Sequence, residues 1–516
     1  IIDHCINTGT MNGFIGLGGI VGFNAGGVFN CQLSDNFGNP GLDYIGGIAG
    51  LNVHAGGAKE GAGGIGRKTS TYTDVLGNQW NDFTSGTVAQ CSTQEKRNIS
   101  GRSYVGGIVG YNLSGAGMIS NRNNANVTGA GDYVGGMAGA NSGSILVAEN
   151  GNANPAYAIA GNNGQGIGGI VGWNRASGII DVTSDKEDVT EIVAVDNNVS
   201  ITGREKVGGI VGINEGKLDA SATDQSVQER FLVCRAKSVH ATGGYAGGII
   251  GEARRKAGTA GEAKIARAIN KSVNVTADRG PAGGIVAVNQ QGFQLESCIN
   301  LGNVNSDNGY AGGIAAENYG QIMQCKVGDE TREEVGITIS SRGADAIGAV
   351  CAVNHGVIWE SAPEKSMAEK EGKNTVILSG TSKLVGGIAG QNAAGGQIGM
   401  VYEDGTDANT TLYHVSYMPH IDIAAAALTV GGVAGQNQPA LFEADGRKYM
   451  VTSGMTGYIP NKSDAAVSDG WEEEFASLGN PHVQDSSNAS FNSQISKIFK
   501  VEGKENCFIA MADRWV

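Results

Sequence analysis

Hydrophobic and polar positions in this chain follow one eight-residue pattern that recurs along most of its length. In the copy at Val105–Asn112 the pattern reads Val-Gly-Gly-Ile-Val-Gly-Tyr-Asn. A unit that recurs every few tens of residues is typical of a solenoid, because a single repeat cannot bury its apolar face alone. Twelve copies occur, at Leu17–Asn24, Ile45–Asn52, Val105–Asn112, Val134–Asn141, Ile167–Asn174, Val207–Asn214, Ala246–Ala253, Ala282–Asn289, Ala311–Asn318, Ile347–Asn354, Val385–Asn392 and Val430–Asn437.

The isoleucine position of the pattern accepts only Ile, Val or Met in the twelve copies. This near exclusion of polar residues predicts one internal ladder that runs from the first copy to the last. The glycine positions that flank it indicate close approach of a neighbouring backbone. The position before the final Asn accepts residues as different as Phe23 and Glu252, so we expect it to face solvent. Representative members of the isoleucine column are Ile20, Ile48, Ile108, Ile170 and Ile210.

The final position is Asn in eleven copies, among them Asn112, Asn174 and Asn214. Asn tolerates left-handed backbone and its amide both donates and accepts hydrogen bonds. Stacked coils would place each amide against the next, which predicts a hydrogen-bonded ladder along the rod. The exception is Ala253, where we expect the ladder to break.

The spacing of the copies predicts an all-β parallel β-helix of about twelve three-strand coils. The shortest intervals, 28 residues from Gly18 to Gly46 and 29 from Gly283 to Gly312, suit one coil per repeat. At about 4.8 Å per coil, the rod would be roughly 55–60 Å long. We expect residues 1–438 to form the β-helix, with inserted loops between copies. Residues 439–516 lack the pattern and are predicted to be a C-terminal β cap or the start of a following domain.

Two phrases in the chain carry a family resemblance. Val-Gly-Gly-Ile-Val-Gly-Tyr-Asn at Val105–Asn112 and Ser-Cys-Ile-Asn-Leu-Gly-Asn-Val at Ser297–Val304 resemble the GLUG-type repeats of bacterial cell-surface and secreted proteins. Such repeats occur in adhesin-like proteins and in the non-catalytic parts of some IgA-cleaving peptidases. The resemblance implies an extracellular or cell-surface location and a structural or adhesive role. No residue here matches the metal site of such a peptidase.

Composition and charge narrow the classes of molecule that this chain is expected to bind. Glycine accounts for 85 of 516 residues, and the net charge is −14. A net negative charge spread along the chain disfavours nucleic acid and anionic membranes as partners. No apolar run approaches the length needed to span a bilayer, so we expect no membrane insertion in this segment. A host or microbial glycan or protein remains the expected partner.

The cysteine pattern predicts no metal site and no cofactor. Cys5, Cys31, Cys298 and Cys325 occupy one slot of the repeat, which favours a stack of buried, reduced thiols. Disulfides one coil apart remain an alternative that depends on side-chain geometry. No Cys-x-x-Cys pair is present, which argues against structural zinc.

A search for catalytic motifs predicts that the chain is not an enzyme. It contains no phosphate-binding loop and no His-Glu-x-x-His, and its two Gly-x-Gly-x-x-Gly strings are expected by chance in so glycine-rich a sequence. Three function classes remain: a non-catalytic rigid spacer or binding scaffold, a carbohydrate-binding or carbohydrate-cleaving β-helix, and a non-catalytic segment of a large secreted peptidase. A binding face would align aromatic side chains along one side, and the candidates are Tyr111, Trp173 and Trp359.

Overall fold

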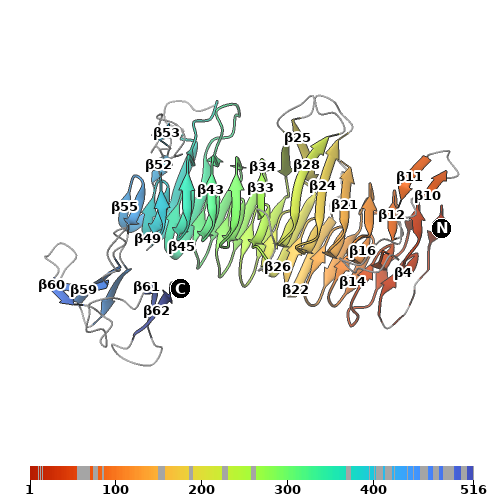
Figure 1. Cartoon of the computed structure of the whole chain (residues 1–516), viewed down its shortest axis with the longest axis horizontal. Helices are drawn as coiled ribbons and strands as arrows, with labels where there is room; N and C mark the ends of the chain where they lie inside the picture. Colours follow the sequence, from red (N-terminus) through yellow and green to blue (C-terminus); the bar gives the residue numbers. More distant parts are fainter. Residues whose placement is uncertain are drawn as a thin grey trace.

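The fold is that of a parallel β-helix, seen in a computed structural model as an elongated stack of coils (Figure 1). The described residues form strands and no helix. The structure describes residues 1–516 except 10, 12, 14, 55–69, 74–78, 84–85, 149–156, 185–189, 223–229, 257–262, 368–373, 394, 400, 403–410, 413–420, 424, 438–439, 445–446, 454–462, 469–475, 480–492, 501–507 and 515–516.

The second half of every repeat copy forms one strand of a continuous twelve-stranded parallel sheet. Equivalent residues pair from coil to coil, so that Asn112 lies between Asn52 and Asn141. This register places each column of the sequence pattern along the rod. The strands are β4 (Val21–Asn24), β9 (Ala49–Asn52), β16 (Val109–Asn112), β20 (Ala138–Asn141), β23 (Val171–Asn174), β27 (Val211–Asn214), β32 (Ile250–Ala253), β37 (Val286–Asn289), β42 (Ala315–Asn318), β46 (Cys351–Asn354), β50 (Ala389–Asn392) and β56 (Ala434–Asn437).

The first residues of each copy, together with the valine-rich segment before them, belong to a nineteen-stranded sheet. Its strands are β3 (Leu17–Gly18), β7 (Phe37–Gly38), β8 (Ile45–Gly46), β14 (Asn98–Gly101), β15 (Val105–Gly106), β18 (Asn126–Gly129), β19 (Val134–Gly135), β22 (Tyr157–Gly168), β26 (Val199–Gly208), β30 (Ser238–Ala241), β31 (Ala246–Gly247), β35 (Asn274–Ala277), β36 (Ala282–Gly283), β40 (Asn303–Ser306), β41 (Ala311–Gly312), β45 (Ile337–Gly348), β49 (Val376–Gly386), β54 (Ile421–Ile423) and β55 (Ala426–Gly431).

The segment after each Asn turn forms two further sets of parallel strands. One set comprises β1 (Ile2–Asp3), β5 (Gly27–Phe29), β12 (Thr87–Ala89), β17 (Gly117–Ile119), β21 (Ser144–Ala148), β24 (Ile179–Ser184) and β28 (Lys217–Ala222), and then β33 (Ala263–Ala266), β38 (Phe293–Glu296), β43 (Gln321–Met323), β47 (Val357–Trp359) and β51 (Gln397–Ile398). The other comprises β2 (Ile6–Asn7), β6 (Gln32–Leu33) and β13 (Ser92–Thr93), and then β25 (Glu191–Val195), β29 (Phe231–Cys234), β34 (Ala268–Asn270), β39 (Ile299–Asn300), β44 (Lys326–Val327) and β48 (Ala362–Pro363). Each coil is therefore divided into more strands than the three predicted, because the Gly-Gly pair bends the chain within each copy.

The isoleucine column forms the predicted internal ladder. From Ile20 to Ile388 each backbone N–H of the column donates to the carbonyl of the equivalent residue in the next coil, as Ile108 does to Met137 at 3.0 Å, and the series ends at the Val433 carbonyl. Ile48, Ile108, Ile170 and Ile210 are fully buried. The two end members differ from the prediction: Ile20 is only partly buried and Val433 is 41% exposed, because each has a neighbouring coil on one side only.

The glycine pair is required by the bend beside this ladder. A Cβ added at Gly106 would lie 2.0 Å from the Val109 carbonyl oxygen, and one added at Gly107 would lie 2.2 Å from the Gly136 carbonyl oxygen. Both contacts are with backbone atoms, which cannot move aside without disrupting the stacking of the coils. The close backbone approach inferred from the sequence is therefore present in each bend.

The asparagine column is a hydrogen-bonded ladder with the predicted break. Side-chain amides donate to the next Oδ1 at 2.7–2.9 Å, from Asn24 through Asn214 and again from Asn289 through Asn437. Ala253 separates the two series. Opposite it, the buried Asn289 Oδ1 has no hydrogen-bond partner among the described residues. At the same position along the rod, β28 and β33 contact each other but do not pair as neighbouring strands of one sheet. The rod thus consists of an N-terminal and a C-terminal half that share one core.

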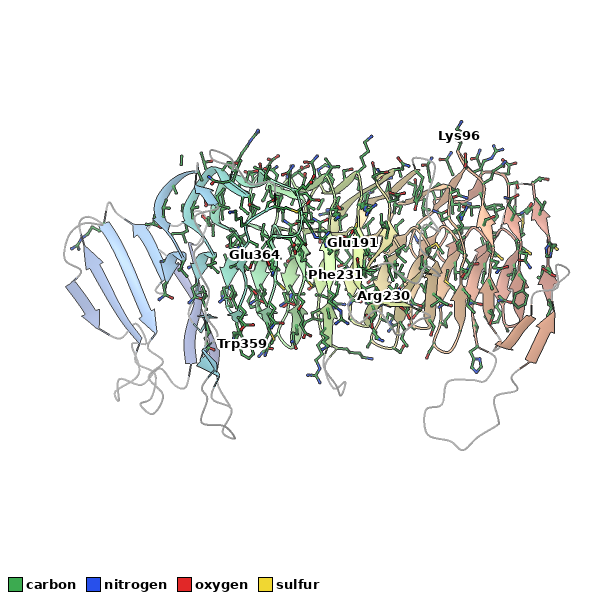
Figure 2. All side chains as sticks on the ribbon, turned by 90° about the horizontal axis from the view of Figure 1, so that it is seen from above. Lys96, Glu191, Arg230, Phe231, Trp359 and Glu364 are labelled. Carbon is green, nitrogen blue, oxygen red and sulfur yellow. The ribbon has the colours of Figure 1, made fainter. Side chains whose placement is uncertain are left out.

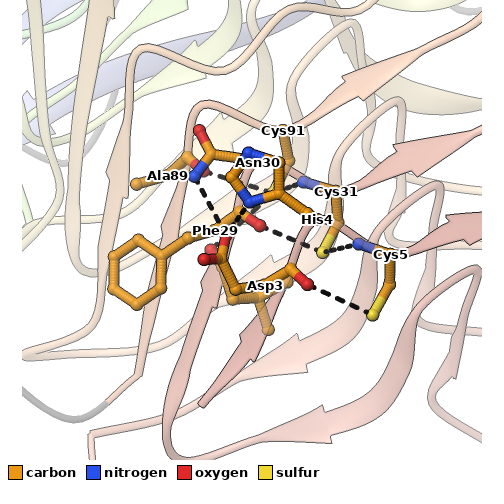
Figure 3. A network of polar contacts seen from close by, with 9 residues as sticks. Asp3, His4, Cys5, Phe29, Asn30, Cys31, Ala89 and Cys91 are labelled. Atoms are coloured by element: carbon orange, nitrogen blue, oxygen red, sulfur yellow. Dashed lines mark hydrogen bonds and ion pairs between the residues drawn. The ribbon is translucent and has the colours of Figure 1, made fainter. Parts of the chain in front are cut away.

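The cysteine slot lies at a corner of the coil. The backbone N–H of Cys5 donates to the Cys31 Sγ and that of Cys31 to the Cys91 Sγ, both at 3.4 Å (Figure 3). Cys298 and Cys325 repeat this contact in the C-terminal half. All are free thiols, and burial raises the pKa of Cys91 and Cys325. This agrees with the predicted stack of buried, reduced thiols at Cys31, Cys298 and Cys325, but not at Cys5, which is exposed because it lies in the first coil.

Antiparallel strands occur only outside the stacked coils in the described part of the chain. The long insertion after Asn52 contains a hairpin, β10 (Ser70–Thr73) with β11 (Gln79–Phe83), and a second hairpin joins β52 (Val401–Tyr402) to β53 (Thr411–Leu412). After Asn437 come β57 (Ala440–Ala444), β58 (Arg447–Ser453), β59 (Ser463–Ser468) and β60 (Ala476–Gly479), followed by β61 (Ser493–Lys500) and β62 (Phe508–Arg514). A cap at 439–516 stays a prediction.

Candidate binding surface

Three columns of side chains run side by side along one corner of the rod, which we call the corner surface. The first column is the residue before each copy, such as Tyr104, whose carbonyl accepts the N–H of Ile45. The second is the position before the final Asn, such as Tyr111 on β16. The third is the residue after that Asn, such as Arg175, whose N–H donates to the Asn141 carbonyl. The residue types in these columns vary from coil to coil, whereas those of the inner columns vary little.

In the N-terminal half, the first two columns form an aromatic ledge of Tyr44, Tyr104, Tyr111, Tyr133 and Trp173. The ring centroids of Tyr44 and Tyr104 are 4.7 Å apart, and those of Tyr104 and Tyr111 are 5.7 Å apart. Tyr133 lies 5.0 Å from Tyr104 and 4.8 Å from Trp173. The rings of Tyr44, Tyr104 and Tyr111 are stacked on one another, with interplanar angles of 11–17°.

The tyrosines of the ledge stand on strained backbone. Tyr44, Tyr104 and Tyr133 have φ values of 59°, 57° and 63°, in the left-handed region that costs an L-residue roughly 1–2 kcal/mol. In two other copies the same position is glycine, Gly16 and Gly166, also at positive φ. The coil thus accepts glycine at this position without that cost. Strained positions of this kind gather at functional sites, where another role offsets the cost.

Arg175 lies at the end of the ledge that is nearer the middle of the rod. The guanidinium carbon lies 4.6 Å above the Trp173 ring, and Nη1 donates a 2.6 Å hydrogen bond to the Tyr111 hydroxyl. That hydroxyl is also 3.0 Å from the Ser142 Oγ. Stacking and hydrogen bonding together fix the orientation of the guanidinium.

A set of ion pairs follows at the middle of the rod. Lys206 Nζ lies 2.8 Å from Glu252, and Arg254 lies 2.7 Å from Glu215 and 3.4 Å from Glu252. Gln290 donates to the other oxygen of Glu252 at 3.0 Å. Glu252 is only 6% exposed, so these partners offset the cost of burying its charge.

In the C-terminal half the same corner carries aromatic and acidic groups together. The Tyr319 and His355 rings stack with centroids 4.6 Å apart, and the Tyr319 hydroxyl donates to Glu317 Oε2 at 2.9 Å. Burial raises the pKa of Tyr310 to about 12, and the Glu317 carboxylate adds to this rise. Burial and Glu317 likewise raise the pKa of Tyr245 and Tyr319.

The structure brings together two of the three predicted binding residues. Tyr111 and Trp173 lie in one ledge, but Trp359 lies on β47 in a different sheet (Figure 2). Trp359 follows the Asn turn, so the alignment expected for all three residues was wrong. The expectation that the second column faces solvent was also wrong in part: Phe23 is 61% exposed, whereas Ile213 is 1% exposed.

The sequence analysis missed the first column of the ledge. Tyr44, Tyr104 and Tyr133 each stand directly before a copy, so the signal was a recurring aromatic residue one position outside the pattern. The strain at these positions could not be predicted from the sequence, because the positive φ is imposed by the bend of the chain and not by the residue type.

Away from the corner surface, Glu191 forms ion pairs with side chains of other coils. Glu191, at the start of β25 (Figure 2), pairs with Lys271 at 3.1 Å, with Arg235 at 3.5 Å and with Arg332. Among the described residues no three His, Cys, Asp or Glu side chains form a group that could hold a metal ion. The described residues also include no helix that is long and apolar enough to cross a membrane.

The fold and the corner surface define an all-β solenoid with an aromatic, partly charged stripe along one corner. Comparison with protein-family models, with curated proteins and with solved structures gave no match to this chain.

Proposed function

We propose that this chain is a rigid, non-catalytic repeat region of an extracellular or cell-surface bacterial protein, and that its corner surface binds a carbohydrate. The aromatic ledge is the observation that carries the proposal. Its rings offer apolar carbon surface and hydroxyl groups side by side, which suits the mixture of C–H and O–H groups on a sugar. Tyr and Trp supply such contacts at low cost in side-chain entropy.

The strained tyrosines favour binding over a purely mechanical spacer. A spacer needs only the inner columns, and glycine at the ledge position satisfies the coil at Gly16 and Gly166. Keeping Tyr44, Tyr104 and Tyr133 there costs backbone energy that a spacer has no reason to spend. The resemblance to GLUG-type repeats supports the location and the adhesive role.

Ion pairing at the corner favours binding without turnover. Glycoside hydrolysis by the usual route needs two carboxyl groups about 5–9.5 Å apart, one of them protonated. Glu215 and Glu252 are instead engaged by Arg254 and Lys206. A cleaving β-helix and a non-catalytic peptidase segment remain the alternatives.

A glycan array combined with a hydrolysis assay tests the proposal. The purified chain would be screened against plant, mucin and bacterial-wall polysaccharides, and the same polymers would be assayed for new reducing ends. We expect binding without cleavage. Cleavage that is lost on substitution of one carboxylate would establish an enzyme instead, and absence of binding to every glycan would favour a spacer.

A further inference from the structure

The aromatic ledge ends at a cation, Arg175, which the Glu215 carboxylate of the next coil attracts without forming an ion pair with it. Arg175 makes no ion pair within the described part of the chain, and one of its five N–H donors is used by Tyr111. Arg254, one coil further than Glu215, shows the contrasting arrangement, since two carboxylates hold it. The two arginines share one column of the corner surface, yet only Arg254 is held by carboxylates.

The ledge next to Arg175 also supplies hydrogen-bond donors. Tyr44 and Tyr104 stack there with ring centroids 4.7 Å apart. Burial raises the pKa of Tyr104 to about 12, so its hydroxyl group stays protonated near neutral pH and can donate a hydrogen bond. The Tyr104 hydroxyl and the Arg175 guanidinium therefore both offer hydrogen-bond donors at this end of the ledge, while Asp132 and Glu215 place negative charge near Tyr133.

Resting on the carbohydrate-binding role proposed above, we infer that the N-terminal half of the corner surface binds an acidic polysaccharide, and that Arg175 receives a carboxylate of a uronic or sialic acid residue. The planar guanidinium matches a carboxylate with two parallel hydrogen bonds. Neighbouring rings of the ledge are 4.7–5.0 Å apart, close to the length of one sugar residue in an extended chain. The polymer would lie along the rod, across the tyrosines of the ledge.

The net charge of the chain makes this recognition selective. At −14 overall, the rod repels polyanions except where a local cation is exposed to them. A polymer that places a carboxylate at Arg175 gains this pairing, whereas the net negative charge of the chain opposes polyanion binding elsewhere on the rod.

The test compares each acidic polymer with its own neutral form. Polygalacturonate, alginate, hyaluronan and polysialic acid would be titrated by calorimetry against the whole chain, beside the same polymers after carboxyl reduction or methyl esterification. We expect at least one acidic form to bind about tenfold more tightly than its neutral form, as a charge-assisted hydrogen bond implies. Arg175→Gln should abolish this preference and keep the weaker neutral binding. Arg175→Lys, which keeps the charge without the planar fork, should retain only part of it.

Arg122→Gln is the matched control, because Arg122 is an exposed arginine that lies beside Ser92 and away from the corner columns. It should leave the preference intact, and thermal melts would show that all variants fold. Equal binding of acidic and neutral forms, a preference for sulfated polymers only, or an equal loss of both forms in Arg175→Gln would overturn the inference while carbohydrate binding stands. Failure to bind any glycan in either form would overturn the proposed function itself.

Discussion

The two halves of the rod share one core but differ along the corner surface. On the N-terminal side of Ala253 the corner carries stacked tyrosines beside the unpaired Arg175, and on the C-terminal side it carries tyrosines beside the Glu317 carboxylate. Inside, the isoleucine ladder crosses from one half to the other without interruption. Stacking constrains the inner columns and leaves the corner columns free to differ, so two different surfaces stand on the same scaffold.

The largest expected effect tests whether the core is equivalent in the two halves. Ile210→Asp and Ile314→Asp each bury an unpaired carboxylate in the isoleucine ladder, where both side chains are fully buried. Each should lower the free energy of unfolding by about 4 kcal/mol or more. Urea unfolding followed by circular dichroism measures this.

The control is Ile179→Asp, on an isoleucine that is 41% exposed in β24, which should cost less than about 1 kcal/mol. A small effect at Ile314 beside a large one at Ile210 would show that the two halves do not share one cooperative core.

A smaller effect should follow from joining the two asparagine series. Ala253→Asn supplies an amide that donates to the unpaired Asn289 Oδ1, so we expect stabilisation of about 1 kcal/mol. Ala253→Leu fills similar volume without an amide and should destabilise. Asn141→Ala should destabilise as well, because it interrupts the series within the N-terminal half. If Ala253→Asn and Ala253→Leu lowered the thermal midpoint equally, the break would reflect packing and not a missing hydrogen bond.

The sequence predicted the features of the fold that the stacking of one coil on the next requires. Columns such as Ile108 and Asn112 repeat because each copy must fit the one above it, so burial, the ladder and the break at Ala253 followed from residue type alone. The corner surface did not follow, because an outward column has no such constraint. Whether Tyr111 contacts Tyr104 and whether Trp359 joins them depends on which residues the bend turns to the same corner.

The smallest expected effect concerns the pKa values at which tyrosine hydroxyl groups in the two halves lose their proton. Tyr104 has a folded pKa of about 12 against 10.0 for the free side chain. Its contribution to stability is therefore complete below about pH 10 and is lost as the pH rises to about 12. In the other half, burial and the Glu317 carboxylate raise the pKa of Tyr319. Glu317→Gln should lower the pKa of Tyr319 and leave that of Tyr104 unchanged.

Titration of tyrosinate absorbance, with Tyr104→Phe and Tyr319→Phe to assign the steps, measures both values. Glu360→Gln is the control, since Glu360 bonds Gln324 away from the corner. An unchanged pKa of Tyr319 in Glu317→Gln would show that the Glu317 carboxylate does not make the tyrosines of the two halves differ.

Paired measurements on Tyr104→Gly test most directly whether the corner surface carries the function. Glycine relieves the strain at φ 57° but removes ring contacts worth about 0.5–1.5 kcal/mol per pair, so the change in unfolding free energy should be far smaller than for Ile210→Asp. Calorimetric titration of the same protein with the tightest-binding glycan should show affinity weakened at least about tenfold, while Tyr319→Ala in the other half should bind as the parent chain does. Unchanged glycan affinity in a folded Tyr104→Gly protein would contradict a binding role for the ledge.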